Sequence, residues 1–157
     1  MSAFRPEHVV RTHHFELPLA PRDAFHFFTP EGERAWAPGW EPRYLHPEDG
    51  RATAGMVFTT GHGDEETLWI MTRHEPGHGL VEYSRVTPGS RMGTVRVACT
   101  SPAAGRTRVT VTYMLTGLSE ASNATLRAFD AGYERFIDGW GGLIRAVVSG
   151  TRSATTT

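Results

Sequence analysis

Apolar and polar residues along this chain follow the period of a strand in some segments and the period of a helix in others. Residues 8–17 predict a first strand, because their apolar side chains share one parity. Residues 19–40 predict two short helices, since Pro21 suits a first helical position and Pro30 ends the first apolar run. Between residues 40 and 115, apolar residues recur at about every second position within each segment, which is typical of strands with one buried face.

Six further strands are predicted, at residues 40–46, 55–60, 66–74, 79–87, 92–100 and 107–115. The last of them alternates most regularly, with Val109, Val111 and Tyr113 on one face and threonines on the other. Short segments rich in glycine, proline and aspartate separate the strands and are typical of turns. Such connections favour hairpins, so we expect one antiparallel sheet with a dry face and a wet face.

The last predicted element is a single amphipathic helix over residues 119–149, about 45 Å long. Its apolar residues form one stripe, Ser119 can cap its start and Gly150 can end it. No other segment is long enough to cover the dry face of the sheet. We therefore expect the helix to lie on that face.

Glycines interrupt this helix, and each costs about 1 kcal/mol relative to alanine in a helix interior. On a helical wheel Gly132 and Gly139 flank the apolar stripe, whereas Gly141 lies on the opposite side. Two interpretations remain open. A flanking glycine allows close packing of the helix, or it leaves space beside Trp140 for a ligand.

This order of elements resembles the helix-grip fold of the Bet v 1-like, START-like (SRPBCC) superfamily, which includes polyketide cyclases/dehydrases and activators of the Hsp90 ATPase. The resemblance is carried by FELPLAPRDAFHFFTPEGERAWAPGW, by ETLWIMTRHEPGHGLVEYSRV and by the closing helix. It implies an α+β fold: a curved antiparallel seven-stranded sheet, two short helices after the first strand, and a long C-terminal helix over the concave face. We expect one domain over residues 1–157, with a core at about 8–149 and a flexible tail at 150–157.

The resemblance also implies a hydrophobic cavity between the sheet and the C-terminal helix. Members of the superfamily bind lipids, sterols, polyketides, plant hormones or flavonoids, and some are enzymes. This chain is rich in large aromatic side chains, which suit an apolar pocket with a few placed polar groups; alternatively, they fill the core. The expected ligand-binding residues are Trp36, Trp40, Phe58, Trp69, Met71, Tyr83, Arg85, Tyr113, Phe129, Tyr133 and Trp140.

Arg85 has the same strand parity as Tyr83, so an inward Tyr83 implies an inward Arg85. An arginine inside the protein has to be paired or hydrogen-bonded. It could hold a ligand carboxylate or enolate, with Tyr83 as a second donor; alternatively, it extends to the sheet edge. A register slip of one residue would exchange every assigned face.

Other chemistry has little support in the residues. The histidines show no metal-ligand spacing, so no metal site is expected, and no cofactor motif or nucleophile–base pair identifies a catalytic residue.

A net charge of -1 without basic blocks argues against nucleic acid as a partner. The sequence has no stretch of about 18 uninterrupted apolar residues, so no membrane span is expected. The single Cys99 excludes an internal disulfide and favours a cytoplasmic protein. A homodimer is possible.

Three hypotheses follow for the function. The first is a protein that binds a small hydrophobic ligand, such as a lipid, a polyketide or an aromatic compound, in the cavity. The second is an enzyme of the polyketide cyclase or aromatase type, which would use the same cavity. The third is an interaction module like the Hsp90 activators, whose outer surface carries the function.

Overall fold

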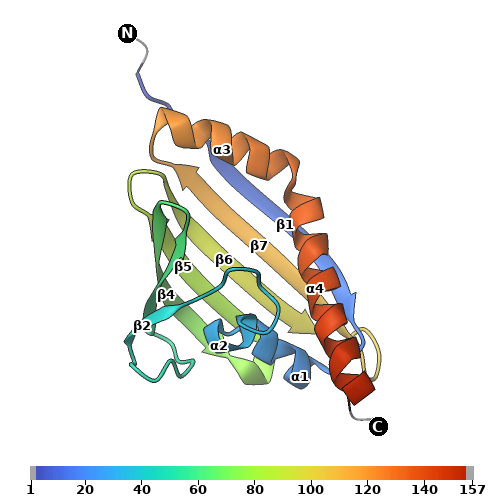
Figure 1. Cartoon of the computed structure of the whole chain (residues 1–157). Helices are drawn as coiled ribbons and strands as arrows, with labels where there is room; N and C mark the ends of the chain where they lie inside the picture. The colour runs from blue at the N-terminus through green and yellow to red at the C-terminus, as the bar shows by residue number, and fades with distance from the viewer. Residues whose placement is uncertain (1–2, 155–157) are drawn as a thin grey trace.

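Seven antiparallel strands form one curved sheet in the computed structural model, which describes residues 3–154 (Figure 1). The spatial order is β1-β7-β6-β5-β4-β3-β2, so only β1 leaves its place in the meander, to pair with β7. The strands are β1 His8–Leu17, β2 Arg43–His46, β3 Val57–His62, β4 Glu65–Glu75, β5 Leu80–Thr87, β6 Arg91–Thr100 and β7 Thr107–Gly117. The predicted sheet is confirmed, with all seven strands at or near their expected positions.

The expected parity of the strands is also confirmed across most of the sheet. In β7, Val109, Val111 and Tyr113 are buried. The alternation fails in β4, where the register shifts between Met71 and Arg73. Met71 is fully buried, but Arg73 is exposed and pairs with Glu75 at 2.7 Å. Strict alternation along ETLWIMTRH predicts Arg73 on the same face as Trp69 and Met71; this prediction is wrong, because a bulge offsets the pleat.

Short helical segments follow β1, as expected, and lie at one end of the sheet (Figure 1). They are α1 Pro21–Phe25, the 3-10 turn η1 His26–Phe28 and α2 Pro30–Glu33; a further 3-10 turn, η2 Pro76–His78, joins β4 to β5. Thr29 caps α2, since its hydroxyl accepts a hydrogen bond from the Gly32 N–H at 3.1 Å. After α2 the chain makes turns through Trp36 and then passes in front of the concave face of the sheet (Figure 1).

The C-terminal segment forms two helices, α3 Glu120–Ala131 and α4 Tyr133–Ala154, so the prediction of one unbroken helix is wrong. The break is at Gly132, whose φ of -99° and ψ of 8° leave the helical range. The bend lets α3 cross the end of the sheet while α4 lies over its concave face beside β1 (Figure 1). The predicted cap at Ser119 is confirmed, and it forms a capping box with Ser122.

The expected flexible tail at residues 150–157 falls in two parts. The backbone of α4 continues to Ala154, so residues 150–154 extend the helix beyond its expected end. Residues 155–157 lie outside the described part of the chain.

The glycines of α4 have different surroundings. Gly141 is buried against β1, where a Cβ atom would lie 3.0 Å from the Phe15 ring and 2.9 Å from Arg145 Nη1. Its expected place opposite the packed face is therefore wrong. A Cβ on Gly139 or on Gly142 would meet nothing within 4 Å. Close packing thus explains Gly141, and a different explanation is needed for Gly139.

Candidate ligand-binding site

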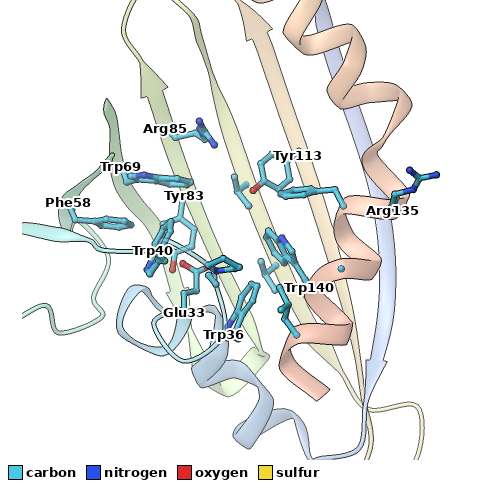
Figure 2. A pocket seen from close by; sticks show the side chains of 17 residues that line it. Glu33, Trp36, Trp40, Phe58, Trp69, Tyr83, Arg85, Tyr113, Arg135 and Trp140 are labelled. Atoms are coloured by element: carbon cyan, nitrogen blue, oxygen red, sulfur yellow. The ribbon is translucent and has the colours of Figure 1, made fainter. Parts of the chain in front are cut away.

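A cavity of about 440 Å³ lies between the concave face of the sheet, the chain after α2 and the helix α4 (Figure 2). Eight of the eleven expected residues line it: Trp36, Trp40, Phe58, Trp69, Tyr83, Arg85, Tyr113 and Trp140. They come from six separate elements or connections, and the curvature of the sheet brings them together.

The other three expected residues, Met71, Phe129 and Tyr133, lie outside the cavity wall. Met71 and Tyr133 are fully buried. Phe129 and Tyr133 pack behind Tyr113, at centroid distances of 5.3 and 5.9 Å. The Tyr133 hydroxyl donates to the Val111 carbonyl oxygen at 2.6 Å. These three residues belong to the core, which is the alternative that the sequence left open.

Nine lining residues lie outside the expected set: Glu33, Ala37, Pro38, Val95, Val97, Arg135, Phe136, Gly139 and Leu143. Of these, Gly139 agrees with the open interpretation that a glycine leaves space beside Trp140. The valines belong to the buried face of β6, so parity could have identified them. Phe136, Gly139 and Leu143 lie three or four positions apart on α4, but their spacing is equally typical of a helix that packs on a core. Glu33 gave no signal, because a charged residue in a short helix usually faces water.

Three of the tryptophans are held in place by their indole N–H groups. Trp36 donates to the Phe27 carbonyl at 2.8 Å, Trp40 to the Pro30 carbonyl at 2.9 Å and Trp69 to Thr60 Oγ1 at 2.9 Å. Since these polar atoms are occupied by the protein, the rings present mainly apolar surface to the cavity.

The aromatic rings also support one another. Phe58 stacks on Trp69 with an interplanar angle of 3° and a centroid distance of 5.7 Å. Trp40 meets both rings edge-on, at 6.0 and 5.8 Å. On the opposite wall Trp36 and Trp140 lie 5.3 Å apart. Such offset and edge-to-face contacts fix the rings beyond what burial alone does, so the wall is rigid.

Tyr83 faces inward as expected, but its hydroxyl is already engaged. It donates to the Phe28 carbonyl oxygen at 2.6 Å in a buried bond that ties β5 to η1. Burial raises the pKa of the Tyr83 phenol well above its ordinary value of 10.0. The expectation that Tyr83 donates to a ligand is therefore not supported by this geometry.

Tyr113 has a different environment on the facing wall. Its hydroxyl makes no hydrogen bond to any residue in the described part of the chain, and Figure 2 shows it pointing into the cavity. Burial raises the pKa of Tyr113 to about 12. The phenol is therefore a neutral hydrogen-bond donor at physiological pH.

Glu33 contributes an acid to this largely apolar cavity. Its side chain forms neither a hydrogen bond nor an ion pair within residues 3–150, although it is only partly buried as a whole. Desolvation raises the pKa of the Glu33 carboxyl well above its ordinary value of 4.5. A carboxyl group with a raised pKa keeps its proton to higher pH than an exposed glutamate does.

Arg85 lies on the inner face, as its parity with Tyr83 predicted. The guanidinium carbon is 4.8 Å from the centroid of the Trp69 ring, and Nη2 donates to Thr87 Oγ1 at 3.3 Å. Burial lowers the pKa of Arg85, but a guanidinium remains charged in proteins. Figure 2 places Arg85 at one end of the cavity and Glu33 at the other.

Other reactive groups lie away from this site. Burial raises the pKa of Cys99 to about 12, so it is a thiol and a poor nucleophile. Among residues 3–150, no three histidine, cysteine, aspartate or glutamate side chains gather closely enough to hold a metal ion. None of the described helices combines the length and apolar character that crossing a membrane requires.

Comparison with known proteins gives matches in structure alone. No protein-family model matches the chain. No curated protein matches it in sequence. Several solved structures superpose over nearly the whole chain. An uncharacterised protein from Rhizobium leguminosarum has a TM-score of 0.67 at 11% identity, with 92% of this chain and 97% of that chain covered.

Two characterised proteins superpose as well. Norcoclaurine synthase from Thalictrum flavum, in complex with dopamine and hydroxybenzaldehyde, has a TM-score of 0.67 at 11% identity, over 92% of this chain and 88% of that one. The Zhui aromatase/cyclase from Streptomyces sp. R1128 has a TM-score of 0.62 at 13% identity, over 91% and 96%. Identities this low establish a common architecture and leave the activity open. The chain has the Bet v 1-like, helix-grip fold.

Proposed function

We propose that this protein binds a small, largely aromatic molecule in the cavity between the sheet and α4. The observation that carries the proposal is the cavity itself: about 440 Å³, walled by aromatic rings, among them three tryptophans whose indole N–H groups are already bonded to the protein. Small-molecule sites are typically of this size and largely apolar. One structure with the same fold holds dopamine and hydroxybenzaldehyde, which are aromatic molecules of a size that suits such a cavity.

The test uses N-phenyl-1-naphthylamine, a neutral aromatic dye that fluoresces when it enters an apolar site. We expect saturable binding to the unmodified protein. Gly139→Leu places a side chain into open space at the cavity wall and should weaken binding at least tenfold. Gly142→Leu is the matched control, because its site is equally open but does not line the cavity. An absence of dye binding, or equal weakening by both variants, would contradict the proposal.

A second candidate is an enzyme of the aromatase/cyclase type. The specific observation in its favour is that Glu33 and the Tyr113 hydroxyl face the same cavity without a partner among the described residues. A carboxyl group with a raised pKa and a phenol could protonate or polarise a carbonyl oxygen as an enolate forms, and such groups contribute about 10²–10⁴-fold to a rate.

This second candidate is tested with a poly-β-ketone substrate and mass spectrometry of the products. Turnover by the unmodified protein, reduced at least a hundredfold in Glu33→Gln with dye binding retained, would support it. Dye binding by the unmodified protein without any aromatic product would leave the binding proposal as the function.

A further inference from the structure

Arg85 lies where no protein group neutralises it. It projects from β5 between Trp69 of β4 and Gly93 of β6, which are its cross-strand neighbours. Gly93 has no side chain that could cover the guanidinium, and on the other side the guanidinium lies over the Trp69 ring. Trp69 is itself fixed by its bond to Thr60, so the platform under Arg85 is rigid.

The hydrogen bonds of Arg85 are also incomplete. A guanidinium has five N–H donors, and within the described residues Arg85 makes one hydrogen bond, from Nη2 to Thr87 Oγ1. Its Nε is buried and has no hydrogen-bond partner, and it is the only such side-chain nitrogen or oxygen in the described part of the chain. A donor that is buried from water and has no acceptor is unfavourable, so the charged guanidinium lacks a full set of hydrogen-bond partners within the described residues.

No carboxylate supplies the missing charge. Glu65 contributes to the field at Arg85, but its carboxylate is bonded to Arg91 at 3.1 Å. Glu33 lies at the far end of the cavity, away from the Arg85 guanidinium, and burial raises the pKa of its carboxyl. The tyrosines that face the cavity are neutral, and Arg135 extends away from it (Figure 2). No carboxylate among the described residues therefore pairs with the Arg85 guanidinium.

We propose that the Arg85 end of the cavity binds an anionic oxygen, a carboxylate or a phenolate, of an aromatic ligand whose ring lies among the tryptophans. The anion would accept from the terminal N–H groups of the guanidinium, which lies in the cavity wall, and the Tyr113 hydroxyl is placed on the opposite wall to donate to the same ligand. This inference rests on the proposed function, because the ligand has to enter the cavity, and it adds the charge of the ligand to it.

The experiment compares 2-naphthoate with 2-naphthamide, which share a ring system and differ in charge at neutral pH. Each displaces N-phenyl-1-naphthylamine from the unmodified protein, and the two dissociation constants are measured. We expect 2-naphthoate to bind at least tenfold more tightly. Arg85→Met keeps most of the side-chain volume and should remove that preference. Arg96→Met, which removes a positive charge from the exposed outer face of the same sheet, should retain it.

The outcomes separate the two proposals. Dye binding with equal affinity for both naphthalene compounds would overturn the inference and leave the proposed function standing. A preference that survives Arg85→Met, or that is lost in Arg135→Met instead, would also overturn it, since the anion would then bind elsewhere. Failure of all three probes to bind would contradict the proposed function itself. The comparison on the unmodified protein remains decisive even where Arg85→Met does not fold.

Discussion

At the scale of single residues, burial alters the chemistry of the three acidic or phenolic groups that face the cavity, Glu33, Tyr83 and Tyr113. Glu33 is an ordinary glutamate in sequence, yet its carboxyl is desolvated and its pKa is raised. Tyr83 and Tyr113 are both inward tyrosines, yet only Tyr83 has a hydrogen-bond partner, the Phe28 carbonyl. A tyrosine therefore has a structural role at position 83, whereas the tyrosine at position 113 has a hydroxyl without a partner among the described residues.

The raised pKa of Glu33 predicts a pH dependence of stability. The unfolded chain loses this proton near pH 4.5, whereas the folded protein keeps it to higher pH. The stabilising contribution of the protonated group is therefore complete below pH 4.5 and is lost as the pH rises toward the pKa of the folded state. Relative to Glu33→Gln, the unmodified protein should lose up to about 1.4 kcal/mol of unfolding free energy per pH unit in that interval. Urea unfolding at pH 5, 6 and 7 measures this, and parallel profiles would contradict it.

The two tyrosines predict opposite results from the same substitution. Tyr83→Phe leaves the buried Phe28 carbonyl without its donor and should lower the free energy of unfolding by about 1–3 kcal/mol. Tyr113→Phe breaks no hydrogen bond within the protein and should cost less. Urea unfolding monitored by tryptophan fluorescence compares them. A larger loss in Tyr113→Phe than in Tyr83→Phe would show that the roles are reversed.

At the scale of elements, α4 shows how one helix serves both the core and the cavity. Ile137 and Ile144 are fully buried, while Gly139 and Trp140 line the cavity on an adjacent face. The apolar stripe was predictable from its spacing, but the helical period alone does not distinguish a side chain that packs on a strand from one that borders a hollow. The break at Gly132 was also missed, because the sequence continues the stripe through it.

The glycines of α4 give a prediction for this element. Gly139→Ala and Gly142→Ala should each raise the free energy of unfolding by up to about 1 kcal/mol, since alanine favours the helix and both sites are open. Gly141→Ala should lower it, because overpacking against Phe15 costs about 1–3 kcal/mol. Thermal unfolding followed by circular dichroism measures the three, at about 2–4 °C per kcal/mol. A stabilising Gly141→Ala would contradict the close packing described for this site.

At the scale of the whole molecule, a ligand in the cavity would contact both the sheet and α4 and should stabilise the folded state as a unit. A ligand at a hundred times its dissociation constant adds about 2.7 kcal/mol. We therefore expect N-phenyl-1-naphthylamine at that concentration to raise the Tm by about 5–10 °C. Gly139→Leu at the same dye concentration should show a smaller rise. An equal rise in both proteins would place the dye outside the cavity.

The outer face of the sheet bears on the third hypothesis. It carries the exposed apolar side chains Val10, Ile70, Met92 and Met114, which lie on four different strands. An interaction module would need such an exposed patch. That hypothesis, a homodimer and a cytoplasmic location all remain predictions from the sequence.

The sequence by itself determined the seven strands, the short helices and the amphipathic C-terminal segment. The periods of a strand and of a helix are local properties, and the spacing of apolar residues along the chain shows them directly. The sequence also identified most of the aromatic wall, since large rings in these positions had to face inward. Only the tertiary structure decided which inward residues border a hollow, that Glu33 is desolvated, that Tyr83 is already bonded and that no carboxylate among the described residues pairs with Arg85. Those properties depend on distances between residues far apart in the chain, and such distances arise only when the sheet curves and α4 packs against it.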